Sequence, residues 1–241
     1  MCYHFSINKS KDYLEKRFAA KFKQPQLFKP IYYASGFEAP RLPVITNQLP
    51  QQIQMINWGL IPNWIKDQAQ AQTIRDKTLN ARADTIFSKP SYQQAIKKQR
   101  CLVLADGFYD WREFKGKKYP YYITLLNDQA FAFAGIWDNW QDSQTKESIL
   151  TFSIITTEAN ELVARIHNIK QRMPVILEPA EEKLWLETDL PMEAITGLMD
   201  PYDTDKMKAH PISKLISARG LEKNLPAIIQ AHNYPELTPL N

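Results

Sequence analysis

This chain of 241 residues has little glycine, cysteine or histidine, with 7, 2 and 4 residues respectively. So few glycines exclude collagen-like and glycine-linker architectures. Neither GxxxxGK(S/T) nor GxGxxG occurs, which excludes the usual nucleotide-phosphate loops, and the GxSxG elbow of many hydrolases is also missing. The histidines and cysteines show none of the paired spacings of metal ligands. We therefore expect no metal, no nucleotide and no other cofactor.

The two cysteines, Cys2 and Cys101, cannot build a disulfide framework, which fits a reducing compartment. Polar residues follow the start of the chain almost at once, so the apolar core of a secretory signal is missing. No run approaches the ~18 apolar residues of a membrane-spanning helix. We expect a cytoplasmic protein that does not enter a membrane.

The net charge of +4 hides a strong asymmetry along the chain. Residues 1–119 carry 20 Lys and Arg against 9 Asp and Glu, whereas residues 120–205 carry 5 against 15. A basic face of this kind suits a polyanion such as nucleic acid. A solvated surface without any partner explains the same charges, so both interpretations stay open.

Local patterns predict a mixture of short strands and short helices. Runs of β-forming residues predict strands at 101–105, 119–126, 130–137 and 150–156, the middle two forming a hairpin. Helical patterns occur near 10–20, 86–98, 159–167 and 179–187. Asp106-Gly107 predicts a turn, and the Pro-rich region 25–50 predicts a loop with an edge strand.

No repeat or linker divides the sequence, and 44% hydrophobic residues suffice for a sizeable core. We therefore expect one domain over residues 1–241. Its fold class is expected to be α+β, with a mainly antiparallel, barrel-like β-sheet and peripheral helices.

The position of Cys2 points to chemistry. Removal of Met1 ahead of this small residue would place an amine and a thiol on adjacent carbons at the N-terminus. Both are accessible nucleophiles near neutral pH, because α-amines titrate near ~7.7–8.0 and thiols near ~8.5. With an aldehyde, the amine forms an imine and the thiol closes on it as a thiazolidine. An incidental small residue is the alternative.

Two further clusters carry groups for proton transfer. Asp110 follows the apolar run 101–105 closely, so a rigid element would hold a carboxylate able to act as general base. His167 stands at the expected end of a helix and precedes Lys170 and Arg172, as a proton donor beside an anion site would. Each of these residues alone is also explained as a surface charge or a satisfied hydrogen-bonding group.

Three more residues are candidates for contacts with nucleic acid. Asn80 and Arg82 alternate along an extended segment, so they would face one side and grip a phosphate or sugar. Trp64 follows a Pro turn; a tryptophan exposed there would stack on an unpaired base, whereas a buried one would belong to the core.

Several motifs occur in a fixed order, and together they resemble the SOS-response-associated peptidase (SRAP) family of abasic-site processing proteins. They extend from residue 2 to about residue 213: Met1-Cys2, Trp58-Gly-Leu-Ile-Pro62, Asn80-Ala-Arg82, Ala105-Asp-Gly-Phe-Tyr-Asp-Trp111, Ile166-His167, Arg172-Met-Pro174 and His210-Pro-Ile-Ser213. The resemblance implies a single compact domain, working as a monomer, with a basic channel for single-stranded DNA.

The resemblance also implies a reaction. Family members remove their own Met1 to expose Cys2, and trap the aldehyde of an abasic site as a thiazolidine DNA–protein crosslink that shields the lesion. Cys2 is then the nucleophile, Asp110 orients or deprotonates its amine, and His167 protonates the sugar ring oxygen during ring opening. An imine at C1′ acidifies C2′, so strand scission by β-elimination is an expected side activity.

The remaining roles follow by the same resemblance. Asn80 would position Cys2 and the sugar, Arg82 would hold a phosphate, and His4, Trp64 and Arg172 would contact DNA. Two alternatives stay open: a cysteine peptidase acting on other proteins, and a single-strand binder that has lost its chemistry.

Two positions depart from the family pattern. Family members usually begin Met-Cys-Gly-Arg, whereas this chain has Tyr3 and His4. A histidine there predicts a weaker, pH-dependent phosphate contact. Asp110 stands where glutamate is usual. The side chain is shorter by roughly 1.5 Å, a displacement large enough to slow the reaction.

Overall fold

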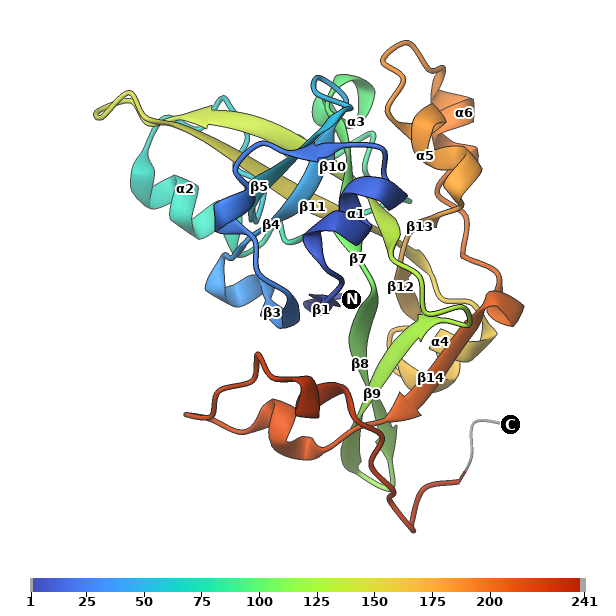
Figure 1. The fold of residues 1–241 in the computed structure, drawn as a ribbon. Coiled ribbons are helices and arrows are strands. Elements are labelled where there is room, and N and C mark those ends of the chain that lie inside the picture. Colours follow the sequence, from blue (N-terminus) through green and yellow to red (C-terminus); the bar gives the residue numbers. More distant parts are fainter. Residues whose placement is uncertain (1, 239–241) are drawn as a thin grey trace.

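Residues 2–238 are described in the computed structural model, where strands of two β-sheets are surrounded by short helices (Figure 1). The expected removal of Met1 falls outside the described residues. The two sheets differ in shape, because one of them closes on itself and the other does not.

The larger sheet contains a closed five-stranded barrel. Its strands pair in the order β4, β5, β11, β10, β7, and β7 returns to β4. The β5–β11 pair is parallel and the other four pairs are antiparallel. The barrel strands are β4 (Arg41–Thr46), β5 (Gln52–Trp58), β7 (Arg100–Ala105), β10 (Phe131–Gln141) and β11 (Ser148–Glu158).

Alternation along β10 shows why these residues form a strand with two buried faces. Phe131 and Phe133 belong to one buried cluster, and Ala132 and Ala134 belong to another. Successive side chains of a strand point to opposite faces, so each face of β10 contributes to a different part of the core. Four short strands extend the same sheet: β2 (Lys21–Phe22), β6 (Asn80–Arg82), β12 (Arg172–Pro174) and β13 (Ile176–Leu177).

The second sheet has five antiparallel strands in the order β14-β9-β8-β1-β3. These strands are β1 (His4–Ile7), β3 (Ile31–Ser35), β8 (Gly107–Phe114), β9 (Lys117–Leu125) and β14 (Met207–Pro211). In Figure 1 β1 lies between the barrel and the C-terminal part of the chain. The strand β1, which follows Cys2, therefore belongs to the second sheet while the barrel lies next to it.

The chain passes from the barrel to the second sheet at Asp106-Gly107. The expected turn is a bend between β7 and β8 and not a reversal of the chain. The Asp106 carboxylate accepts hydrogen bonds from the Ser6 hydroxyl at 2.6 Å and from the Asn8 N–H at 2.5 Å. A Cβ at Gly107 would stand 2.3 Å from the Tyr122 ring, so only glycine fits there.

Two sequence-based predictions of strand pairing are wrong. The strands expected as a hairpin, β9 and β10, exist but belong to different sheets, because the residues between them lead from one sheet to the other. In the Pro-rich region β3 is an edge strand as expected, but β4 lies inside the barrel. Pro43 is tolerated in β4 because the β4–β7 pairing begins only at Val44.

The helices are short and lie outside the sheets: α1 (Lys11–Arg17), α2 (Gln68–Arg75), α3 (Ala95–Lys98), α4 (Glu161–Ile166), α5 (Pro179–Trp185) and α6 (Met192–Gly197). Three predicted helices are confirmed, whereas 86–98 is helical only in α3. The α+β class with a mainly antiparallel, barrel-like sheet and peripheral helices is confirmed. Within residues 2–238 we find no helix with the length and apolar character that crossing a membrane requires.

Candidate functional site

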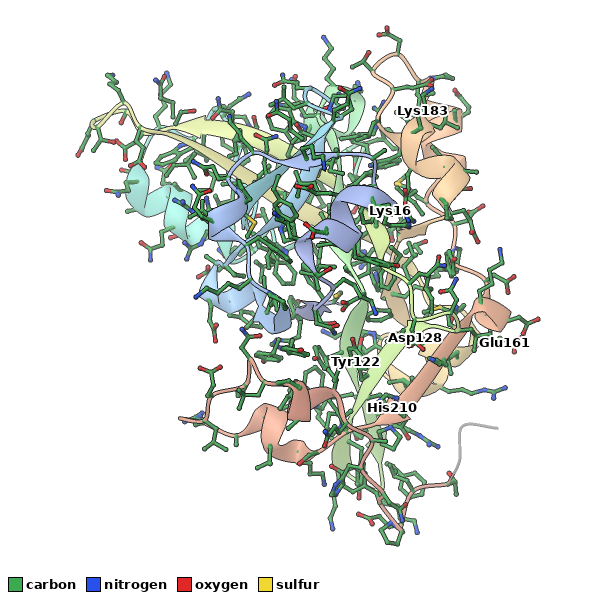
Figure 2. All side chains as sticks on the ribbon, viewed as in Figure 1. Lys16, Tyr122, Asp128, Glu161, Lys183 and His210 are labelled. Carbon is green, nitrogen blue, oxygen red and sulfur yellow. The ribbon has the colours of Figure 1, made fainter. Side chains whose placement is uncertain are left out.

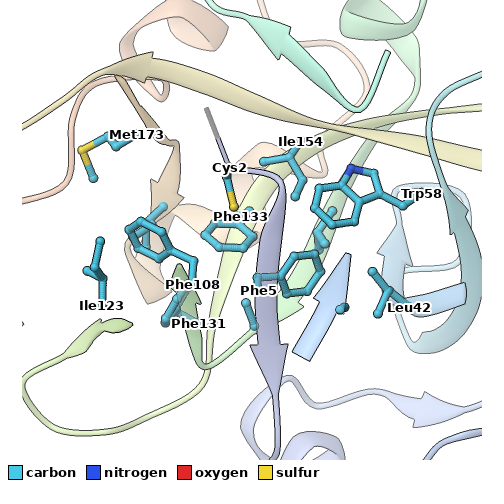
Figure 3. Close-up of a cluster of buried hydrophobic side chains, with 14 of the residues drawn as sticks. Cys2, Phe5, Leu42, Trp58, Phe108, Ile123, Phe131, Phe133, Ile154 and Met173 are labelled. Carbon is cyan, nitrogen blue, oxygen red and sulfur yellow. The ribbon is translucent and has the colours of Figure 1, made fainter. Parts of the chain in front are cut away.

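Cys2 lies just before β1 and is 1% exposed. Its side chain belongs to a buried apolar cluster that includes Phe5, Phe108 and Phe133 (Figure 3). Burial raises the pKa of the Cys2 thiol to about 12, and the charge of Asp110 acts in the same direction. The thiol is therefore held protonated, and Asp110 is near enough to act on it electrostatically.

Asn80 holds the backbone of Cys2 in place. The strand β6 pairs in parallel with β11, with Asn80 opposite Ile154, so the barrel fixes the position of this side chain. Its Nδ2 donates to the carbonyl oxygen of Cys2 at 2.9 Å, and the Tyr92 hydroxyl donates to the Asn80 carbonyl at 3.1 Å. The Asn80 Oδ1 is buried and has no hydrogen-bond partner among the described residues. This oxygen can therefore accept a further hydrogen bond next to Cys2.

Asp110 and His167 form an ionic pair. Asp110 is buried in β8, and its Oδ2 lies 3.6 Å from Nδ1 of His167, which caps the C-terminal end of α4. The Asp110 Oδ1 accepts the N–H of Trp111 at 2.9 Å. Burial raises the pKa of Asp110 above its usual value, although the charge of His167 opposes that shift. A carboxyl with a raised pKa and a histidine partner is suited to proton transfer.

A second contact orients the His167 ring. Its Nδ1 lies 2.8 Å from the carbonyl oxygen of Arg172, which only accepts, so Nδ1 carries a proton in that contact. The Arg172 N–H is farther from the same nitrogen, at 3.4 Å, and we assign the shorter contact. In a neutral ring Nε2 is then the basic nitrogen, and in the charged ring it is a donor.

His4 is enclosed by aromatic rings. It stacks on Tyr33 at 5.2 Å between ring centroids, and the ring of Trp111 meets it edge-on at 5.3 Å. Burial, with a smaller contribution from the charge of Lys223, lowers the pKa of His4 to about 4. A charged contact between His4 and a phosphate would then form only at low pH, and the expected phosphate contact itself stays a prediction.

Of these groups, His4, Asp110 and His167 line a hollow of about 400 Å³, which we call the reaction cleft, whereas Cys2 and Asn80 do not line it. It is lined by Tyr3, His4, Asp110, Trp111, Glu113, Lys118, His167, Ile169 and Lys170. A second hollow of about 590 Å³, the arginine hollow, is lined by Arg82, Glu158, Ala159, Lys170, Gln171 and Arg172. Because Lys170 lines both, the two hollows adjoin and carry several cations along one surface.

Both arginines of the arginine hollow donate hydrogen bonds. Arg82 donates from Nε to Asp84 Oδ1 at 3.0 Å, and Arg172 donates from Nη2 to the Thr156 carbonyl oxygen at 2.6 Å. The Arg172 Nε is buried and has no partner among the described residues. Both guanidinium groups lie at a surface that an anion can reach.

The structure brings most of the candidate residues together. Cys2, Asn80, Asp110 and His167 meet near the reaction cleft, and Arg82 and Arg172 line the hollow next to it. Trp64 is 50% exposed but lines neither hollow, so its role in stacking stays a prediction.

Sequence reasoning missed three neighbours of the site: Lys118, Asp84 and Lys223. Asp84 stands two positions after Arg82, which was a usable signal for an ion pair. No motif marks Lys118 or Lys223, because the fold alone brings them near the site.

Comparison with known proteins identifies the family of the chain that carries this site. The model of the family described as SOS response associated peptidase (SRAP) matches residues 1–219. The Bacillus subtilis abasic site processing protein YoqW is 36% identical over 206 residues, covering 83% of this chain and 88% of that protein. The Gallus gallus abasic site processing protein HMCES is 33% identical over 184 residues, covering 68% of this chain and 53% of that protein.

A solved structure has the same fold. A crystal structure of a protein from Bacteroides thetaiotaomicron superposes with a TM-score of 0.91 at 39% sequence identity, covering 96% of this chain and all of that one.

Proposed function

The chain belongs to the SOS response associated peptidase family, and on that premise we propose that it processes abasic sites in single-stranded DNA by forming a thiazolidine crosslink through Cys2. The observation that carries the proposal is the grouping of Cys2, held by Asn80, with the Asp110–His167 pair at the reaction cleft. Relatives named abasic site processing proteins support the substrate.

The reaction begins with the N-terminus. Hydrolysis of the Met1–Cys2 peptide bond consumes one water, releases methionine and leaves the α-amine of Cys2. That amine is a nucleophile only when it is unprotonated, and the ionised Asp110 is the group that accepts its proton. The family description as a peptidase supports removal of Met1 by the same site.

The amine then attacks C1′ of the ring-opened abasic sugar. His167 in its charged form keeps one N–H on the Arg172 carbonyl and donates the other proton to the ring oxygen during ring opening. It takes a proton back as the C1′ hydroxyl becomes the aldehyde, and donates it to the C1′ oxygen of the amine adduct as water leaves. An imine results. Loss of a proton from C2′ at this stage would break the strand by β-elimination, which is the side activity we expect.

The thiol closes the ring. Sγ of Cys2 adds to the imine carbon, and the thiol proton moves to the nitrogen, so aldehyde and aminothiol give thiazolidine and water. The buried, protonated thiol suits this ordering, because it stays unreactive until the imine stands next to it. The same burial argues against a peptidase acting on other proteins, since such enzymes need an accessible thiolate.

The test is intact mass of the purified protein before and after incubation with a single-stranded oligonucleotide carrying one abasic site. We expect loss of one methionine and then a covalent adduct that survives heat and denaturant. Cys2→Ala and Cys2→Ser should both give no adduct without borohydride, because neither has the thiol that closes the ring. Where Met1 has been removed, both keep an α-amine at position 2 and should give a trapped imine with borohydride.

Cys101→Ala is the matched control, since Cys101 is also a buried thiol but pairs with strands inside the barrel. It should form adduct like the unaltered chain. A processed N-terminus with salt-reversible binding and no adduct would overturn the crosslinking reaction and leave a single-strand binder.

A further inference from the structure

The C-terminal arm, which we define as residues 213–232, packs on the second sheet beside the reaction cleft. Ile216 and Ile228 of the arm are buried with Tyr109 and Tyr122 of β8 and β9. In Figure 1 the arm runs below β3 at the lower end of β8. The SRAP family model ends at residue 219, so most of the arm lies beyond the part of the chain it matches.

The arm touches the wall of the cleft at two points. The Trp111 indole N–H donates to the Ser217 hydroxyl at 3.3 Å, and Trp111 lines the cleft. The Asn224 side-chain oxygen accepts the N–H groups of Tyr32 at 2.7 Å and Tyr33 at 3.4 Å. Because Tyr33 stacks on His4, the arm lies directly behind the aromatic side of the cleft.

Lys223 is the cation that the arm brings to this side. Its Nζ lies 5.4 Å from the centroid of the Tyr33 ring, and its charge acts on His4. Lys223 is half-buried, which leaves part of its ammonium side chain in solvent. The arm as a whole carries three cations, Lys214, Arg219 and Lys223, against Glu222 as its acid.

We propose that Lys223 binds a backbone phosphate of single-stranded DNA where the strand leaves the reaction cleft past His4 and Tyr33. This inference rests on the proposed function, because a lesion held at Cys2 sets where the strand crosses the protein. His4 is neutral and offers no charge for a phosphate, whereas the ammonium beside it does.

Other cations lie along the same surface. Lys170 joins the reaction cleft to the arginine hollow with Arg82 and Arg172. Lys223 lies beside Tyr33, which stacks on His4 of the cleft wall. On this proposal a strand that runs from the arginine hollow through the cleft and past His4 meets a further cation on the arm.

The experiment measures binding of a fluorescent, lesion-free single-stranded oligonucleotide by anisotropy over a range of salt concentrations. Lys223→Gln should weaken binding about three- to tenfold at low salt and make the negative slope of log K against log salt shallower by about 0.7, the value for one phosphate on a single strand. Lys223→Arg should restore both quantities, because it keeps the charge.

Lys16→Gln is the matched control, since Lys16 is an exposed lysine on α1, which lies in the upper half of the molecule in Figure 2 while the arm lies at the lower left. It should bind like the unaltered chain. Equal affinity and slope for Lys223→Gln and the unaltered chain would overturn the inference. Adduct formation by the unaltered chain, measured separately, decides the proposed function whatever the outcome at Lys223.

Discussion

Asp110 and His167, 57 positions apart in the sequence, place a carboxylate oxygen and a ring nitrogen 3.6 Å apart beside the buried Cys2. That distance is an ionic contact and too long for a hydrogen bond. The closer partner of the His167 nitrogen is the carbonyl oxygen of Arg172, at 2.8 Å. In the proposed reaction the carboxylate thus stabilises the ring when it is charged, without holding its proton, and a carboxylate oxygen is available for the amine that removal of Met1 would leave on Cys2.

Replacing Asp110 tests this division of roles. Asp110→Asn removes the base, and we expect crosslinking to slow by at least about 100-fold, in the range usual for a general base. Asp110→Glu should stay within about tenfold of the unaltered chain, because the carboxylate is kept. Single-turnover rates of adduct formation give both numbers, and an Asn variant as fast as the Glu variant would remove Asp110 from the mechanism.

The pH profile gives an independent check on the same carboxylate. Burial raises the pKa of Asp110 above 3.8, and only the ionised form accepts a proton. The rate should therefore fall as the pH falls through that raised pKa, with the acid limb above the range of an ordinary aspartate. In Asp110→Asn this limb should be missing from the profile.

His4 should contribute no charge to DNA binding. Its pKa of about 4 keeps it neutral between pH 6 and 8. We expect the ratio of single-strand affinities between the unaltered chain and His4→Gln to change by less than about twofold over that range, because neither side chain titrates there. Anisotropy at several pH values measures the ratio. A ratio that grows as the pH falls would mean that His4 becomes charged on DNA.

Asp84 should weaken DNA binding by neutralising Arg82. Their side chains are about half-exposed, so the pair contributes little to stability. Asp84→Asn should therefore leave the fold intact and strengthen single-strand binding about two- to fivefold at low salt, since one repelling charge is lost. Asp128→Asn, which removes the partner of Lys208 in another exposed pair (Figure 2), is the control and should change nothing.

Asp106 should stabilise the fold because its side-chain oxygens accept hydrogen bonds, and not because the side chain is negatively charged. Asp106→Ala leaves the Asn8 and Lys9 N–H groups without their acceptor, and we expect a loss of about 2–4 kcal/mol in the free energy of unfolding. Asp106→Asn keeps an acceptor and should cost under about 1 kcal/mol. Urea unfolding measures both variants, and equal losses would mean that the negative charge itself is required.

The pH dependence of the Asp106 contribution has a definite sign. Burial raises the pKa of Asp106 in the folded chain, so its stabilising contribution is complete below the unfolded-state pKa of about 3.8 and is lost as the pH rises through the raised value. As the pH rises from about 3.8 through the raised pKa, the free energy of unfolding of the unaltered chain should therefore fall relative to that of Asp106→Asn, which has no group that titrates at this position.

The sequence predicts where helices and strands occur better than it predicts which strands pair. β7 and β11 are confirmed because apolar, β-branched runs are local signals, and α5 is confirmed because Pro179 and two glutamates mark its start. The expected helix at 86–98 shrinks to α3, since the residues before it form turns. The prediction of a hairpin of β9 and β10 is wrong because pairing depends on which sheet each strand joins, and the neighbouring residues in the sequence do not determine that.

The site is predictable only as far as its motifs reach. Asn80, Asp110 and His167 were named from their patterns, and the fold brings them to Cys2 as expected. The lowered pKa of His4 could not be foreseen, because it depends on burial in the packed chain and on Lys223, more than 200 positions away. Burial and distant charge are properties of the packed chain.

The grip of Asn80 on Cys2 crosses from one sheet to the other. Cys2 leads into β1 of the second sheet, whereas Asn80 stands on β6 of the sheet that holds the barrel. The arrangement of the site is therefore an outcome of complete folding: a nascent or half-folded chain has the cysteine, but neither the burial that keeps its thiol protonated nor the side chain that fixes its backbone.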